Sequence, residues 1–98
     1  MDMIHEVDKI YAIDSNGTII AIVDFPARDA QRVDITHVFV DESLRGQGIA
    51  GKLMELAYSD IKNAGKRIVA KCPFAIAWFK KNPTYQDIVI NVKTNPSV

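Results

Sequence analysis

Apolar and polar residues alternate in short runs along the first forty residues, which is the pattern of β-strands. The runs cover residues 4–13, 18–25 and 31–40. The first two are separated by Asp14-Ser15-Asn16-Gly17, and an Asn-Gly pair between apolar runs is typical of a hairpin turn. The third run becomes apolar towards Val40, as expected of a strand that enters the buried centre of a sheet.

The period changes to three and four residues from position 48 onwards, which predicts an amphipathic helix over 48–64. Gly65 follows as a left-handed cap, and the run "RIVAKC" (67–72) predicts a further strand. Pro73 suits the first turn of a short helix over 73–81. The run "DIVINV" (87–92) predicts a last strand, and we expect the final residues, "TNPSV", to fray.

The strand 31–40, the helix 48–64 and the strand 67–72 form a strand–helix–strand unit. A right-handed crossover makes the two strands of such a unit parallel. The predicted fold class is therefore α+β. We expect one domain over residues 1–98, with a mixed sheet of an antiparallel meander and a parallel strand pair, and two main helices on its faces.

Composition limits the kinds of partner that the chain can attract. Of its 98 residues, 48% are hydrophobic and 24% are charged, which indicates a globular domain. Twelve basic and twelve acidic residues cancel, so no general charge draws the protein to nucleic acid or to an anionic membrane. The single cysteine and the lack of a Cys/His metal-ligand spacing predict a cytoplasmic protein without a metal site.

The stretch Arg45-Gly46-Gln47-Gly48-Ile49-Ala50 begins the longer helix without a Ser, Thr, Asp or Asn cap. The first amides of a helix have no internal acceptor, and glycines allow an anion to approach the main chain. The stretch is therefore either an anion site or a tight turn. A Walker phosphate loop does not fit, because Leu53 stands where its hydroxyl residue is needed.

The segment "VDESLRGQGIAGKLMELA" resembles the acetyl-coenzyme A signature of the GNAT superfamily of N-acetyltransferases, with Arg45, Gly48 and Ala50 at its defined positions. Together with "CPFAIAWFKKNPTY" further on, it is similar to the compact branch of that superfamily over about residues 5–90. The resemblance implies a GNAT-like fold whose two parallel strands splay apart and bind acetyl-CoA. It also implies that the coenzyme diphosphate is bound by the glycine loop and the start of the helix, namely Arg45, Gly46, Gln47, Gly48, Ile49, Ala50 and Gly51. The pantetheine arm is then bound by the end of the preceding strand, namely Val38, Phe39 and Val40.

Two side chains are candidates for catalysis. Cys72 ends a strand directly before Pro73, where the positive end of the following helix stabilises a thiolate. His37 lies near the end of the neighbouring strand and can accept a proton at neutral pH. The alternatives are a small buried hydrophobe for Cys72 and a core residue for His37.

One position departs from the superfamily pattern. Many larger members carry a tyrosine that protonates the leaving thiolate, and Phe79 stands at the equivalent place here. That role then falls to Cys72, to solvent or to Tyr85. The short helix is nearly apolar all round, so we expect Phe74, Trp78 and Phe79 to be mostly core, with one edge, including Phe79, facing the acyl groove. Lys80 suits the coenzyme 3′-phosphate.

The sequence therefore predicts an acetyl-CoA-dependent N-acetyltransferase. Its acceptor is an amine, either a small molecule or a protein lysine, and transfer is direct or passes through acetylated Cys72. Two alternatives stay open, which are a non-catalytic acyl-CoA-binding module and a small interaction domain whose glycine loop is purely structural.

Overall fold

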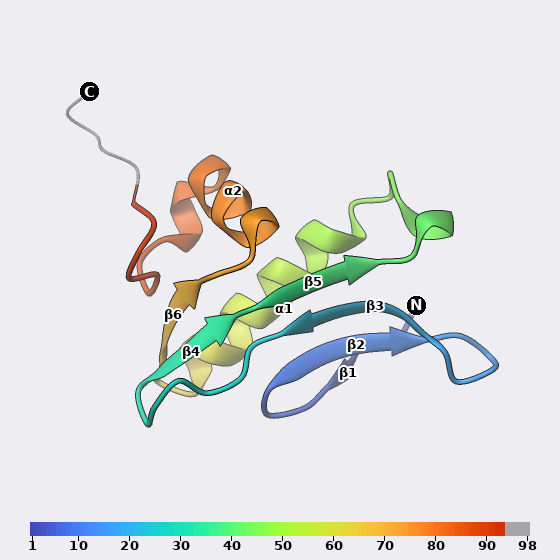
Figure 1. Ribbon diagram of the computed structural model, residues 1–98, viewed down its shortest axis with the longest axis horizontal. Helices are drawn as coiled ribbons and strands as arrows, with labels where there is room; N and C mark the ends of the chain where they lie inside the picture. The colour runs from blue at the N-terminus through green and yellow to red at the C-terminus, as the bar shows by residue number, and fades with distance from the viewer. Residues whose placement is uncertain (94–98) are drawn as a thin grey trace.

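The computed structural model describes residues 1–93 (Figure 1). The tail 94–98, for which we expected fraying, lies outside the described residues. The elements follow in the order β1 (Ile4–His5), β2 (Lys9–Ile13), β3 (Ile19–Asp24), β4 (Arg32–Ile35), β5 (His37–Val40), η1 (Glu42–Leu44), α1 (Ile49–Asn63), β6 (Arg67–Ala70), α2 (Pro73–Lys81) and η2 (Pro83–Tyr85).

The N-terminal region is an antiparallel meander, as predicted. The run 4–13 is divided into β1 and β2, because the chain reverses between them with Glu6 donating its amide to the Lys9 carbonyl at 2.8 Å. β2 and β3 are joined by the predicted hairpin turn. Asp14 Oδ1 accepts the amides of Asn16 and Thr18, and Gly17 adopts a φ of 82°.

The predicted third strand is also divided, and its two halves belong to different sheets. β5 pairs antiparallel with β3 in a four-stranded sheet of order β1-β2-β3-β5, whereas β4 pairs parallel with β6 in a two-stranded sheet. The change occurs at Thr36, whose amide donates to the Asp24 carbonyl at 3.1 Å. Beyond this point β5 and β6 diverge, so the expected splay is present (Figure 1).

Helix α1 packs against both sheets and forms the centre of the core. Its fully buried side chains Leu53, Met54 and Ala57 meet buried residues such as Ile10 and Ile35. Each large apolar side chain buried in this way stabilises the fold by about 1.5–3 kcal/mol. The helix ends as predicted, since Gly65 is left-handed and the Gly65 and Lys66 amides donate back to carbonyls of the last turn.

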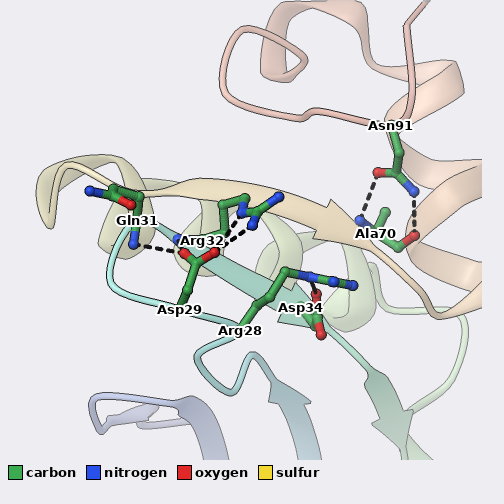
Figure 2. A network of polar contacts seen from close by, with 7 residues as sticks. All are labelled: Arg28, Asp29, Gln31, Arg32, Asp34, Ala70 and Asn91. Atoms are coloured by element: carbon green, nitrogen blue, oxygen red, sulfur yellow. Dashed lines mark hydrogen bonds and ion pairs between the residues drawn. The ribbon is translucent and has the colours of Figure 1, made fainter.

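The C-terminal segment corrects the predicted strand 87–92. It forms only an isolated parallel bridge, in which Val89 is paired with Ile68, because the chain turns at residues 86–89. The Asn91 side chain continues the pairing instead. Its amide accepts from the Ala70 N–H at 2.9 Å and donates to the Ala70 carbonyl at 2.8 Å (Figure 2). The free edge of β6 is therefore covered up to its last residue.

The polar turn before β4 is held by local ion pairs, also drawn in Figure 2. Asp29 accepts the amides of Gln31 and Arg32 and pairs with the Arg32 guanidinium, which lowers the pKa of Asp29. Arg28 pairs with Asp34 at 2.8 Å. These contacts fix the entry of the chain into β4.

Candidate active site

The N-terminus of α1 is an uncapped row of main-chain amides. Gly48 is the N-cap residue in a left-handed conformation, with φ 74° and ψ 15°, and no side chain caps the helix. Asp41, in the loop before the helix, instead accepts the Ser43 amide and hydroxyl in η1. No acceptor among residues 1–93 bonds the amides from Gly46 to Gly51. The positive helix end is thus open to an anion.

Two adjoining cavities open beside these amides. They have volumes of about 280 and about 300 Å³ and share Val40, Arg45, Ala50 and Phe74. The first is also lined by Leu44, Gly46, Gly48, Ile49 and Gly51, and the second by Val38 and Phe39. Since they share four residues, the cavities form one cleft that runs from the glycine loop to the end of β5.

The cleft includes a free strand edge. The Asp41 amide donates to the Ile20 carbonyl at 2.7 Å, and Phe39 is paired with Ile22 in the same register. Bonded pairs alternate along antiparallel strands, so Val38 and Val40 direct their N–H and C=O groups away from β3. Arg45 Nε donates to the Val40 carbonyl at 3.3 Å, as this direction requires. An extended ligand in the cleft would meet main-chain donors and acceptors.

Cys72 lies at the N-cap of α2, as the sequence predicts. Its backbone is extended, its side chain is partly buried, and its carbonyl accepts the Ile76 amide at 3.0 Å. The amides of Lys71 and Cys72 both donate to the Ile35 carbonyl at 3.0 Å. The main chain at Cys72 is therefore in direct contact with β4 where the two sheets part.

His37 begins β5, two residues after Ile35, and its side chain is exposed. It is opposite Asp24 in the register with β3, and it lines neither cavity of the cleft. No hydrogen bond joins its imidazole to another residue of the described chain. The structure thus brings the backbones near Cys72 and His37 together, while the imidazole stays exposed.

Phe79 requires a correction. It is fully buried, with 0% exposure, in the hydrophobic core, so it is not a surface of the cleft. Ala75, one turn earlier on the same helix, is buried in the same way. The exposed edge of α2 at the cleft is provided by Phe74, which is 40% exposed.

Three further predicted residues lie outside the cleft lining. Gln47 and Lys80 are exposed, Gln47 in the glycine loop and Lys80 in the last turn of α2. Tyr85 donates its hydroxyl to Glu55 Oε1 at 3.0 Å, and this bond raises the pKa of Tyr85. Leu44 lines the cleft but was missed by the sequence analysis. The sequence did contain an indication of this role, because Leu44 is the single apolar residue in an otherwise polar loop.

The described residues contain no cluster of His, Cys, Asp and Glu that could hold a metal ion. Within residues 1–93, neither helix has the length and apolar character needed to cross a bilayer.

Comparison with solved structures shows the same fold. A GCN5-like protein from Staphylococcus aureus, solved by NMR, is 24% identical with a TM-score of 0.78, and the match covers 97% of this chain and 93% of that protein. A GNAT family N-acetyltransferase from Escherichia coli in complex with CoA is 29% identical, with a TM-score of 0.55 over 63% of this chain and 38% of that one.

A GNAT family acetyltransferase from Elizabethkingia anophelis with acetyl-CoA bound is 25% identical, with a TM-score of 0.53 over 63% of this chain and 40% of its own length. The chain thus spans less than half the length of these last two proteins. No curated protein matches it. The family model described as GCN5-related N-acetyl-transferase matches residues 10–88, which is most of the chain. With its splayed strands and uncapped glycine loop, the chain therefore belongs to the GCN5-related N-acetyltransferase family.

Proposed function

We propose that this protein binds acetyl-CoA in the cleft and transfers the acetyl group to an amine. The observation that carries the proposal is the row of uncapped amides from Gly46 to Gly51, which opens on the cleft beside the free edge of β5. The family match and the neighbours with CoA or acetyl-CoA bound support it.

The coenzyme diphosphate binds the amides of the glycine loop and the first turn of α1. Each hydrogen bond to a charged oxygen contributes about 1.5–3 kcal/mol, so a few of them provide much of a micromolar affinity. Arg45 lies beside these amides. The pantetheine arm extends along the Val38 and Val40 edge, and Phe74 covers it from the other wall of the cleft.

The thioester then lies where β5 and β6 diverge. The amine nitrogen attacks the thioester carbonyl carbon, which is polarised by the Val40 N–H. The carbon–sulfur bond breaks and the coenzyme leaves as a thiolate that takes up a proton. The proton lost by the amine passes to His37 or to water.

Cys72 offers a second route. Its thiolate attacks the thioester first, the coenzyme leaves, and the amine then attacks the acetyl-cysteine. Intact mass measurement after exposure to acetyl-CoA without acceptor distinguishes the routes. A gain of one acetyl group that Cys72→Ser abolishes supports the covalent route, and an unchanged mass with normal turnover supports direct transfer.

Coenzyme binding itself is tested by thermal unfolding. CoA in large excess over its dissociation constant must raise the melting temperature by mass action, whereas pantetheine, which lacks the diphosphate, raises it much less. The absence of a shift with CoA would contradict the proposal and favour the small interaction domain.

A non-catalytic acyl-CoA-binding module is the second candidate. Phe79, at the place of the tyrosine acid, is buried in the core and has no proton to donate. Coenzyme release measured over a panel of small amines and lysine peptides separates the two functions. Tight binding with release no faster than hydrolysis supports the binding module.

A further inference from the structure

Gly51 has no conformational reason to be glycine. It is the third residue of α1, and its φ is not among the positive values found at Gly17, Gly46, Gly48 and Gly65. Glycine inside a helix is about 1 kcal/mol less favourable than alanine. We therefore look for the reason for glycine at this position in the side chain that lies closest to it.

The neighbour that approaches Gly51 is the indole of Trp78. A Cβ added at Gly51 would lie 3.4 Å from Trp78 Nε1. Because Gly51 is the third residue of α1, the indole nitrogen lies beside the first turn of this helix. Trp78 is also one turn after Phe74 on the same face of α2. Phe74 lines the cleft and Trp78 itself lines neither cavity, so the indole lies next to the cleft wall.

The indole ring is held in this position by other aromatic rings. Its centroid is 5.0 Å from that of Tyr85 and 5.3 Å from that of Phe79. Tyr85 is in turn bonded to Glu55, one turn after Gly51 on the same face of α1. The ring is therefore fixed against the first turns of α1.

The Nε1–H donor of Trp78 bonds no acceptor within residues 1–93. No buried polar side-chain atom of the described chain lacks a partner, so this N–H must reach solvent. A donor that is held by aromatic packing and has no partner thus lies next to Gly51, whose amide is one of the unpaired amides at the start of α1.

We propose that Trp78 binds the coenzyme directly, with its Nε1–H donating a hydrogen bond to a diphosphate oxygen beside the Gly51 amide. This inference rests on the proposed function, because it adds a side-chain donor to the main-chain site. It also gives Gly51 a role, since any side chain there would cover the indole nitrogen.

Isothermal titration with CoA at fixed ionic strength tests the contact. Trp78→Phe keeps an aromatic ring but removes the N–H, and the dissociation constant should rise about tenfold. Tyr11→Phe is the matched control, because it removes the hydroxyl that Tyr11 donates to Glu6 outside the cleft and should change the constant less than twofold. A Trp78→Phe protein that binds CoA within twofold of wild type would overturn the proposal.

The choice of phosphate is tested with dephospho-CoA, which lacks the 3′-phosphate. Trp78→Phe should weaken dephospho-CoA and CoA by the same factor. A loss confined to CoA would show that the indole contacts the 3′-phosphate and would overturn the assignment to the diphosphate.

The unmodified protein provides a second readout, because Trp78 is its only tryptophan. Saturation with CoA should change the emission of this residue with the same dissociation constant as the titration heat. Unchanged emission at saturation rejects the role of Trp78 while leaving coenzyme binding intact. No binding heat with wild-type protein would instead reject the proposed function.

Discussion

Gly48 and Gly65 adopt nearly the same left-handed backbone conformation, with φ values of 74° and 73°. Neither position has an atom within 4 Å of where a Cβ would stand. They stand at opposite ends of α1, since Gly48 precedes its first residue at the cleft and Gly65 follows its last turn. Comparing the same substitution at both glycines therefore separates the free-energy cost of backbone strain from the loss of a contact to the ligand.

Gly48→Ala and Gly65→Ala should therefore destabilise the fold alike, by about 1–2 kcal/mol each in chemical denaturation, because alanine is strained in the left-handed region. Only Gly48→Ala should also weaken CoA binding, as it disturbs the amides that hold the diphosphate. Equal CoA affinity in the two variants would contradict a site at the glycine loop.

The side chains of α2 show why single residues were assigned less well than elements. Two pairs spaced by four residues, Phe74 with Trp78 and Ala75 with Phe79, compete for the core because the helix is apolar nearly all round. Only packing against the rest of the fold selects Ala75 and Phe79 for burial. The sequence therefore predicted the helix bounds correctly and wrongly assigned Phe79 to the cleft.

At the scale of elements, local signals were sufficient for both helices and for the hairpin. Pro73, Gly65 and the Asn16-Gly17 pair each act on their own backbone, so their effects are visible in the sequence. The division of the third strand was not predictable in this way. It depends on which partners pair with its two halves, β6 with one and β3 with the other.

The Asn91 bridge to Ala70 belongs to the same scale, because a side chain takes the place of a strand. Asn91→Ala should destabilise the protein by about 1–2 kcal/mol, since two hydrogen bonds to β6 are lost. Chemical denaturation measures the change, and an unaltered midpoint would show that solvent replaces both bonds without cost.

A second variant, Asn91→Asp, tests the same two hydrogen bonds through the pH dependence of stability. Its carboxylate still accepts from the Ala70 N–H but repels the Ala70 carbonyl, whereas the protonated form can donate to that carbonyl. Folding then favours the protonated acid, so the stability of Asn91→Asp relative to wild type should rise as the pH falls. A difference independent of pH would contradict the bridge.

The whole molecule consists of two sheets that diverge at one end and are joined through α1 (Figure 1). The cleft lies between β5, the start of α1 and Phe74 of α2. The resemblance of the sequence to the superfamily gave this arrangement, since hydrophobic periodicity alone does not fix the angle between sheets. The direction of the free N–H and C=O groups of Val38 and Val40, away from β3, became clear only from the structure.

Hydrogen exchange tests the cleft as a unit. CoA should slow exchange at Val38, Val40 and the amides from Gly46 to Gly51 together, because one ligand contacts both walls. The exposed hairpin turn at Asn16 and Gly17, which opens locally, should exchange at an unchanged rate. Slowing at the loop without the strand edge would contradict the position of the pantetheine arm.

The continuity of β4 and β5 through Thr36 restricts how this region of the chain can change in length. Side chains alternate along a strand, so losing or gaining one residue at Thr36 would exchange the faces of the four residues after it. His37 and Phe39 would then point towards α1, and the valines that now pack there would turn to solvent. We therefore expect insertions at the hairpin turn to leave the cleft unchanged, whereas inserting or deleting one residue at Thr36 would remove the β5 side chains that line the cleft.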